Sequence, residues 1–325
     1  MKQKKLEETV HGILEREGFT IEDGVASKPE VRLELGIYSS EEYSEEDVDR
    51  SKDKIFVDEG LNVESAYTIE EEVDYNLPSF ELIGDIAIIN DLSGRSRKEA
   101  EEGILAHHDV KTILLKTEGL SGEYRVGEYE KLYGEETETI HREHGKEFKV
   151  DPSQAYFSER FSTERKRVAD KIEKGENVLV MFAGVGPFAV LCADKASKVV
   201  AVEKNPKACG YLEENVQLNN MVEKIEVHCG DVVDVIPQLN EKFDRVIMPL
   251  PESALEFLDL ALGSLKDEGM IHLYSFVEDE DFRPVERKIN DLVSEENLRH
   301  EIVDRVRCGY KSPSEDRYCF DIKVL

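Results

Sequence analysis

The sequence predicts an α/β domain built on a mainly parallel sheet and preceded by a smaller α+β domain. From Asn177 onward, short apolar runs alternate with helical segments, which is typical of parallel strands joined by crossover helices. Between residues 80 and 150, the apolar runs are short and separated by turn residues, as in a small mixed domain. The 325 residues are enough for two domains with separate cores.

The composition indicates a folded protein that does not enter a membrane. Hydrophobic residues make up 40% of the chain and charged residues 35%, which is too apolar for a fully disordered chain. No apolar run approaches the roughly 20 residues that a membrane helix needs. The charged N-terminal stretch lacks the apolar segment of a secretory signal. We therefore expect a cytoplasmic protein without a membrane partner.

The chain is strongly acidic, with 42 Lys and Arg against 72 Asp and Glu and a net charge of −30. Taken alone, this charge argues against a nucleic-acid partner, because Lys and Arg drive binding to phosphates. At about 1 M salt, however, the Debye length is only roughly 3 Å, so an acidic surface no longer repels itself. We expect a halophilic source with a salt-rich cytoplasm, in which local charge rather than net charge decides the partner.

The cysteines and histidines do not have the spacing of a disulfide framework or a metal site. The cysteines are Cys192, Cys209, Cys229, Cys308 and Cys319. Their number is odd and no two are spaced C-x-x-C, so the sequence predicts scattered buried thiols. The histidines suggest no ligand set, and we expect no bound metal.

Residues 1–78 form an acidic N-terminal segment whose role the sequence leaves open. The segment begins with apolar residues at helical spacing, and residues 41–53 are polar and acidic, as expected for an exposed loop. The small α+β domain then covers residues 79–157. Its predicted elements are a strand–turn–strand at 80–90, a helix at 96–108, a strand at 111–117, and short strands with turns at 121–150.

The α/β domain covers residues 158–325. Its first five predicted strands are joined mostly by helices, whereas the last two strands are separated by a short polar turn and form a hairpin. A parallel sheet that ends in an antiparallel hairpin is the architecture of class I, Rossmann-like methyltransferases. The predicted strands are 177–182, 198–203, 224–229, 244–250, 270–276, 300–306 and 318–324, with helices from Pro187 and over 206–220.

A glycine-rich turn follows the first strand of this domain. In the sequence FAGVGPF, which begins at Phe182, Gly184 and Gly186 allow a tight turn and a close approach of the backbone to a ligand. Pro187 suits the first position of the following helix. A G-x-G sequence after a strand is by itself weak support for a nucleotide site.

Two carboxylates make the nucleotide site more specific, because they end the next two strands. Glu203 lies where a carboxylate accepts hydrogen bonds from ribose hydroxyls, and Asp231 lies where it could meet an adenine amino group. The alternatives are an exposed strand end for Glu203 and a helix N-cap for Asp231, and capping and ligand binding can coexist. The terminal hairpin favours S-adenosylmethionine over NAD as the cofactor.

Several stretches together resemble the archaeal and eukaryotic tRNA (guanine-37-N1)-methyltransferase family, over residues 79–325. This resemblance implies S-adenosylmethionine-dependent methylation of guanine N1 at tRNA position 37, next to the anticodon. It also implies a small domain that positions tRNA, and we expect a monomer, with any Mg²⁺ arriving through the tRNA. The stretches are SFELIGDIAII (79–89), GEYRVGEYEKLYGEETETIHREHG (122–145), AYFSERFSTERKRVA (155–169), FAGVGPF (182–188), VEKNPKACGYLEENVQLN (202–219) and IMPLPESALEFLDLAL (247–262).

The resemblance assigns catalytic roles to Arg125 and Glu164, which belong to different predicted domains. Arg125 would support the guanine carbonyl, Glu164 would be the general base, and Tyr156 would lie near the target base. The chemistry requires these residue types, because neutral guanine N1 must lose its proton while charge grows on O6. The alternatives are an exposed turn position for Arg125 and an ion pair of Glu164 with Arg167 or Lys171 on one helix.

The remaining assignments concern a basic stretch and a proline-rich turn. Residues 159–171 carry five bases and three acids, and we expect Arg160 and Arg165 to contact RNA. Pro249 would lie beside the cofactor and Pro251 beside the substrate. The family commonly reads N-L-P where this chain has Pro249 first, so no side-chain amide is available there for the guanine.

Two other functions remain open. One is transfer of the aminocarboxypropyl group of the same cofactor to a modified guanine in the wybutosine pathway, and the L-P pair argues for methylation instead. The other is a catalytically inactive tRNA-binding homologue, which only the missing asparagine supports.

Overall fold

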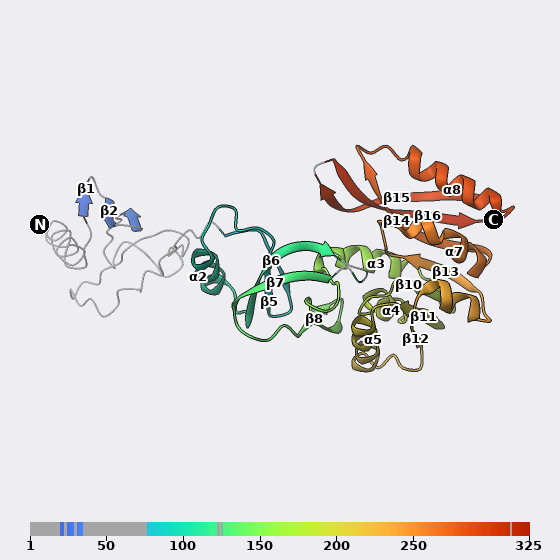
Figure 1. Ribbon diagram of the computed structural model, residues 1–325, viewed down its shortest axis with the longest axis horizontal. Helices are drawn as coiled ribbons and strands as arrows, with labels where there is room; N and C mark the ends of the chain where they lie inside the picture. Colours follow the sequence, from blue (N-terminus) through green and yellow to red (C-terminus); the bar gives the residue numbers. More distant parts are fainter. Residues whose placement is uncertain are drawn as a thin grey trace, which may run out of the picture. The chain divides into compact units, whose positions relative to one another are not determined.

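The computed structural model describes residues 20–22, 25–28, 31–34, 77–121, 124, 126–312 and 314–325 (Figure 1). The chain separates into two units, Met1–Asn76 and Leu77–Leu325. In the first unit, three short strands form an antiparallel sheet, and the predicted helical stretch and the loop at 41–53 lie outside the described residues. These strands are β1 (Thr20–Glu22), β2 (Val25–Lys28) and β3 (Val31–Glu34).

The second unit begins with a small four-stranded sheet in the order β4-β5-β6-β7. The hairpin of the first two strands turns at Gly84, whose φ of +57° lies in the left-handed region that glycine tolerates. Helix α2 then carries the chain to a strand parallel to β5. The elements are β4 (Phe80–Ile83), β5 (Ile86–Ile89), α2 (Arg97–His107), β6 (Thr112–Ser121) and β7 (Val126–Tyr133), followed by the hairpin of β8 (Thr139–Glu143) and β9 (Lys146–Val150).

Local signals explain α2. Ser96 and Glu99 form a capping box, in which the Ser96 side chain accepts a hydrogen bond from the Glu99 backbone and the Glu99 carboxylate accepts one from the Ser96 backbone. The helix buries Ala100 and Ile104 against the small sheet. The strand–turn–strand, helix and strand predicted between residues 80 and 117 are thereby confirmed.

The rest of the unit is a seven-stranded sheet in the order β12-β11-β10-β13-β14-β16-β15. The first five strands of that order are parallel, and β16 is antiparallel to both its neighbours, as the predicted hairpin requires. The predicted α/β fold class is confirmed. The strands are β10 (Asn177–Met181), β11 (Lys198–Glu203), β12 (Ile225–Cys229), β13 (Phe243–Met248), β14 (Leu265–Glu278), β15 (His300–Ser312) and β16 (Glu315–Val324).

Helices cover both faces of this sheet (Figure 1). Alternate residues of β10 point to opposite faces: Val178 and Val180 pack with α3, α4 and α5, while Leu179 and Met181 pack with α7 and α8. The helices are α3 (Ser162–Asp170), α4 (Pro187–Cys192), α5 (Pro206–Leu218), α6 (Val232–Val235), α7 (Leu258–Ser264) and α8 (Arg283–Glu295), with 3-10 turns η3 (Glu159–Phe161), η4 (Ile236–Gln238) and η5 (Ala254–Phe257). No helix among the described residues is long and apolar enough to cross a membrane.

Two asparagines, one in α5 and one at its C-cap, fasten strand β9 to the large sheet domain. The Asn215 amide accepts a hydrogen bond from the Lys149 backbone at 2.7 Å and donates to the Lys149 carbonyl at 3.0 Å. One turn later, Asn219 makes the same pair of bonds with the backbone of Glu147. These amides replace a partner strand for β9, so they orient the small domain next to the turn that follows β10.

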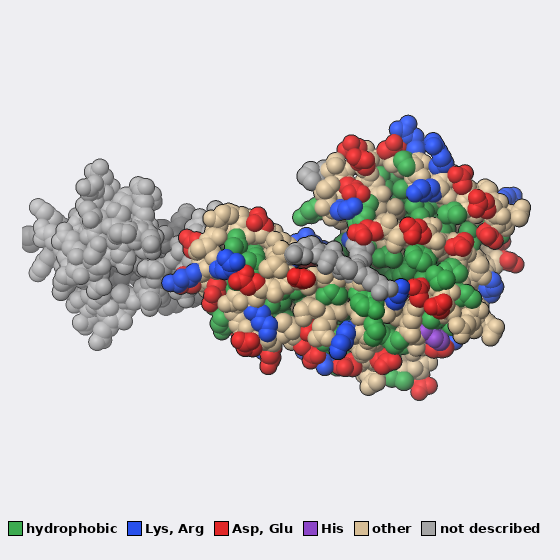
Figure 2. All heavy atoms as spheres, in the orientation of Figure 1, with side chains coloured by type: hydrophobic (Ala, Val, Ile, Leu, Met, Phe, Trp, Pro, Cys, Tyr) green, Lys and Arg blue, Asp and Glu red, His purple; other side chains and the backbone are tan. Residues whose placement is uncertain are grey.

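Acidic side chains are spread over the face of the described residues shown in Figure 2. Many acidic side chains pair with a lysine or arginine, as Glu130 of β7 does with Arg97 of α2 at 2.8 Å. Exposed ion pairs of this kind each contribute little to the stability of the fold.

Candidate cofactor and RNA site

The turn after β10 presents open backbone at the edge of the sheet. Phe182, Gly184 and Gly186 all have positive φ values, of 55°, 59° and 91°. A Cβ on Gly186 would overlap Leu212, so packing requires glycine there. Beside Gly184 the space is open, and the nearest atom to a Cβ built there is the Tyr156 carbonyl oxygen at 3.8 Å. A ligand can therefore approach the backbone at Gly184.

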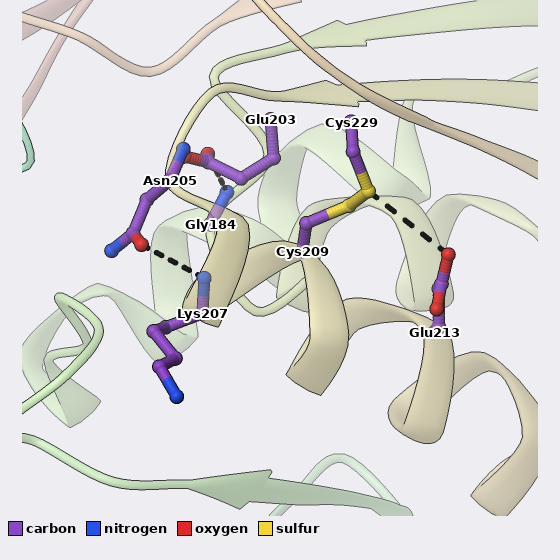
Figure 3. The surroundings of a disulfide bond; sticks show 7 residues. All are labelled: Gly184, Glu203, Asn205, Lys207, Cys209, Glu213 and Cys229. Carbon is purple, nitrogen blue, oxygen red and sulfur yellow. Dashed lines mark hydrogen bonds between the residues drawn. A yellow bond between two sulfur atoms is a disulfide. The ribbon is translucent and has the colours of Figure 1, made fainter.

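Glu203, at the end of β11, is fixed by the backbone around this turn (Figure 3). Its Oε2 accepts a hydrogen bond from the Gly184 N–H at 2.7 Å, and its Oε1 accepts one from the Asn205 N–H at 2.7 Å. Burial raises the pKa of Glu203, and the bonds from Asn205 and Gly184 partly oppose this rise. Each oxygen keeps a further lone pair, so the oriented carboxylate can accept hydrogen bonds from a diol.

Asp231, after β12, is the N-cap of α6, as the alternative interpretation expects. Its Oδ1 accepts a hydrogen bond from the Val233 N–H at 3.0 Å, and its Oδ2 pairs with Lys204 Nζ at 2.7 Å. These two contacts hold the pKa of Asp231 below its usual range. The Gly230 N–H donates to the Glu203 carbonyl at 2.8 Å, which keeps the two acidic loops adjacent.

The cysteine prediction is wrong for one pair. Cys209 of α5 and Cys229 of β12 form a disulfide with Cα atoms 5.8 Å apart (Figure 3). Cys192, Cys308 and Cys319 are free. The spacing of 20 residues gave no signal, because parallel strands and their crossover helix bring these positions together only in the folded chain.

These three loops fit an adenosine-containing cofactor. They lie at the carboxyl ends of three adjacent parallel strands, where α/β sheets bind ligands. The open backbone at Gly184 suits the part of the cofactor that runs along the turn. Glu203 suits the ribose, because it accepts hydrogen bonds from a diol, and Asp231 suits an adenine amino group. When bound, S-adenosylmethionine would supply the transferable group.

Glu164 is buried in an ion pair, which is the alternative that the sequence left open. It is 5% exposed. Its Oε1 accepts hydrogen bonds from the Tyr274 hydroxyl at 2.6 Å and from Arg167 Nη2 at 2.8 Å, and its Oε2 accepts one from Arg167 Nε at 2.7 Å. The general-base role therefore stays a prediction, and the sequence did not reveal Tyr274 as a partner.

The ion pair continues into a buried network across the sheet. Arg167 also donates to Asp321 at 2.7 Å, and Asp321 accepts a hydrogen bond from His272 Nδ1 at 2.6 Å. Arg245 approaches His272 Nε2 at 2.8 Å. Although His272, Cys319 and Asp321 lie within 4.8 Å of one another, both imidazole nitrogens are already engaged. We interpret this cluster as a structural network rather than as a metal site.

Tyr156 and Arg160 lie at a cavity of about 460 Å³ between the small sheet and the hairpin of β15 and β16. Tyr156 is 41% exposed, and Arg160 pairs with Glu81 at 2.7 Å. The cavity is lined by Ser79, Glu81, Ile88, Asn90, Lys116, Tyr129, Pro152, Tyr156, Phe157, Ser158, Arg160, Phe161, Cys308, Gly309, Tyr310 and Arg317.

Two residues that the sequence predicts to contact the substrate, Arg165 and Pro251, are buried, and their substrate roles stay predictions. Arg165 is 3% exposed, pairs with the Glu143 carboxylate and donates to the Ser158 carbonyl at 3.0 Å. Arg165 thereby fixes α3 to β8. Pro251 is also buried. The basic stretch is thus not a free cationic face, because acidic partners neutralise it.

Two further predictions concern positions whose roles stay open. Arg125 lies outside the described residues. Pro249 is half-buried directly after β13, where the Leu250 N–H donates to the Met248 carbonyl at 2.9 Å. The structure therefore brings Gly184, Glu203 and Asp231 together at one edge, with Tyr156 next to them.

The strand order and the three-loop cofactor edge define a class I methyltransferase fold. The TRM5/TYW2 methyltransferase domain family matches residues 139–302, and the TYW2 N-terminal domain family matches residues 65–137. The chain belongs to the TRM5/TYW2 methyltransferase family, which confirms the resemblance seen in the sequence.

Known relatives of this family include both methyltransferases and aminocarboxypropyltransferases. The chain is 37% identical to the tRNA (guanine(37)-N(1))-methyltransferase Trm5b of Pyrococcus abyssi over 79% of this chain and 78% of the relative. It is 39% identical to a tRNA(Phe) (4-demethylwyosine(37)-C(7)) aminocarboxypropyltransferase of Methanocaldococcus jannaschii over 64% of this chain and 83% of the relative. The crystal structure of M. jannaschii Trm5 in complex with adenosine matches with a TM-score of 0.65 and 31% identity, covering 79% of this chain and 78% of that one.

Proposed function

We propose that this chain transfers the methyl group of S-adenosylmethionine to N1 of the guanine at position 37 of tRNA. The observation that carries the proposal is the position of Gly184. Its N–H donates to the cofactor-side carboxylate of Glu203, and its open face looks toward the Tyr156 carbonyl. The cofactor turn and the segment expected to hold the target base therefore meet. The Trm5b relative, which carries this activity in its name, supports the same assignment.

Within this proposal, Glu164 takes the N1 proton and Arg125 stabilises the charge on O6. Both oxygens of Glu164 are engaged by Arg167, and one of them also by Tyr274. Oε2 accepts only the bond from Arg167 and keeps a further lone pair for the N1–H, but the Glu164 carboxylate is 5% exposed, so RNA binding has to uncover it. Methyl transfer then depends on holding N1 in line with the sulfonium methyl group.

The alternative is aminocarboxypropyl transfer to a modified guanine. It is favoured by the aminocarboxypropyltransferase relative and by the TYW2 N-terminal domain match. Pro249 in place of the family asparagine is compatible with either reaction. An inactive tRNA-binding homologue would keep the same cofactor edge.

We further propose that the enzyme works as a monomer in a salt-rich cytoplasm, with any Mg²⁺ supplied through the tRNA. In this proposal, residues 79–157 position the tRNA and residues 158–325 carry the cofactor.

Incubating the full chain with transcript tRNA and S-adenosylmethionine, followed by mass analysis of the nucleosides, tests the function. The expected product is 1-methylguanosine, formed only when position 37 is guanosine. A matched transcript with adenosine at that position is the control. A mass gain of an aminocarboxypropyl group on a wyosine-type tRNA would support the alternative, and no modification of either RNA would favour the inactive homologue.

A further inference from the structure

The cavity beside Tyr156 contains an arginine, Arg317, whose guanidinium has no polar partner among the described residues. The Arg317 guanidinium lies 3.8 Å from the Phe161 ring centroid and 5.6 Å from that of Phe276. Its Nε is buried and has no hydrogen-bond partner. Arg317 is half-buried, and no hydrogen bond or ion pair joins its guanidinium to another residue that the structure describes. In a chain of net charge −30, such a cation is an unusual feature.

A second cation in the same cavity also lacks an acidic partner. Lys116 of β6 lines the opposite wall, and no ion pair with a described residue engages its ammonium group. The cavity carboxylate Glu81 is already paired with Arg160 at 2.7 Å. Neither Arg317 nor Lys116 thus has a carboxylate partner among the described residues, so an anionic group in the cavity would pair with both cations.

The wall of the cavity is aromatic. Tyr310, in the hairpin of β15 and β16, is 68% exposed, and the neighbouring Gly309 lies so close to Phe161 that a Cβ there would be 3.0 Å from the ring. Tyr156 lines the same cavity at 41% exposure. Figure 1 shows the turn of this hairpin on the side of the large sheet that faces the small domain. Aromatic side chains with nearby cations are the combination that binds single-stranded nucleic acid.

We propose that this cavity binds an RNA nucleotide next to the modified guanine. Its base stacks on Tyr310, and its phosphate is held by Arg317 and Lys116. We place a neighbour of the reacting base there, because the methyl acceptor must lie against the cofactor edge and the lining of the cavity includes none of the residues of that edge, Gly184, Glu203 and Asp231. Tyr156 joins the two positions, since its carbonyl faces Gly184 and its side chain lines the cavity. The inference rests on the proposed function for the identity of the RNA.

Binding of an anticodon stem–loop RNA, followed by fluorescence anisotropy, tests the proposal. Tyr310→Ala is expected to weaken binding about 5- to 150-fold, the range for loss of one base stack. Arg317→Met keeps an apolar group against Phe161, and it should weaken binding and reduce the slope of log K against log salt by about 0.7, the value for one single-strand phosphate contact. Cofactor affinity, measured by calorimetry, should be unchanged in both variants.

Matched controls separate this effect from a general loss of surface groups. Tyr133→Ala removes a tyrosine of β7 that is 41% exposed, and Arg287→Met removes an exposed cation of α8. Neither residue lines the cavity. RNA affinity should stay at the wild-type value in both controls. Equal weakening in Tyr133→Ala and Tyr310→Ala would overturn the stacking assignment. An unchanged salt slope in Arg317→Met would overturn the phosphate assignment.

Stem–loop RNAs that lack one base identify the nucleotide. If Tyr310 stacks on a neighbour of the target guanine, removing that base should weaken wild-type binding and abolish the further effect of Tyr310→Ala. If the losses remain additive at both neighbouring positions, the proposal fails.

The proposed enzymatic function and the proposed nucleotide site can fail separately. A wild-type chain that modifies nothing yet shows the Tyr310 effect contradicts only the enzymatic function, whereas an active chain with unaffected variants contradicts only this inference.

Discussion

Two carboxylates of this protein, those of Glu203 and Glu164, have different surroundings, and the surroundings decide which contacts each carboxylate can make. Glu203 receives two backbone N–H groups and keeps lone pairs at an open edge, so it is arranged for a ligand. Glu164 has all its contacts inside the protein, with Arg167 and Tyr274. The same residue type therefore serves as a fixed acceptor at one site and as a member of a buried network at another.

Replacing Glu203 by Ala should weaken S-adenosylmethionine binding. The variant loses charge-assisted hydrogen bonds to the ribose, each worth about 1.5–3 kcal/mol. Isothermal titration calorimetry with the cofactor measures the change. Glu213→Ala, on the exposed side of α5, is the control and should bind normally. Wild-type affinity in Glu203→Ala would remove this residue from the cofactor site.

Glu164→Gln tests the general base, since it keeps the shape of the side chain and removes its basicity. A general base contributes about 10²–10⁴-fold, so single-turnover methylation should slow by that factor while cofactor binding stays intact. Rates are measured from pH 6 to pH 8, with folding checked by thermal melting because the Arg167 pair is altered. Wild-type rates in a folded variant would leave Glu164 with a structural role only.

At the scale of elements, α5 connects every part of the site. Its N-cap residue Asn205 follows the cofactor acid, Cys209 ties the helix to β12, and Asn215 holds β9. The helix is thereby fixed at both ends. The disulfide closes a loop of 20 residues between α5, which follows Glu203, and β12, which precedes Asp231.

Reducing the Cys209–Cys229 bond should destabilise the fold by about 3 kcal/mol on the chain-entropy account. The melting temperature should fall by about 6–12 °C in a domain of this size. Calorimetry with and without a dithiol reductant measures the shift, and the Cys209→Ser, Cys229→Ser double variant should melt like the reduced protein. Cys308→Ser, which removes a free thiol, is the control. If all five cysteines are alkylated without reductant, the disulfide is absent.

The pair between α3 and β8 gives a prediction with a pH dependence. Burial alone would raise the pKa of Glu143, but hydrogen bonds from His141 and Arg165 outweigh it and lower the pKa to about 2. The charged form therefore stabilises the fold above the ordinary pKa of 4.5, and this contribution disappears as the pH falls toward 2.

Arg165→Met should cost about 3–5 kcal/mol at pH 7, because it leaves a buried charge without its main partner. The difference from wild type should shrink at pH 3, where Glu143 begins to take up a proton more readily in the variant. Urea unfolding at both pH values measures it. Arg142→Met, which removes the exposed pair with Glu147, should cost under about 1 kcal/mol. An equal loss in the two variants would contradict a buried, specific pair.

At the scale of the whole molecule, the net charge of −30 predicts a dependence on salt. At about 1 M KCl the Debye length is roughly 3 Å, so repulsion among acidic groups is screened and the free energy of unfolding should rise. Methylation of tRNA should persist at that concentration, whereas a basic RNA-binding enzyme would lose affinity steeply. Activity and urea unfolding measured from 0.1 to 3 M KCl test this. Loss of both well below 1 M would mean that the acidity has another cause.

Much of the site could be predicted because its signals are local. The turn at Gly184 and Gly186, the acid Glu203 and the alternation of strands with helices each depend on neighbours in sequence. The burial of Arg165, by contrast, follows from its contact with Glu143, 22 residues away. Nothing near Arg165 in the sequence distinguishes it from Arg160, which stays exposed at the cavity.

By itself, the sequence determined the α/β class, the order of its strands along the chain and the loops that carry Glu203 and Asp231. These depend on hydrophobic period and turn chemistry, which act over a few residues. Only the tertiary structure decided which charges are free, because pairing depends on atoms that the fold brings together from distant positions. Arg317 and Cys209 illustrate the reason. The buried Nε of Arg317 has no polar partner among the described residues because of the position of the terminal hairpin, and Cys209 is bonded to Cys229 because of the arrangement of α5 and β12.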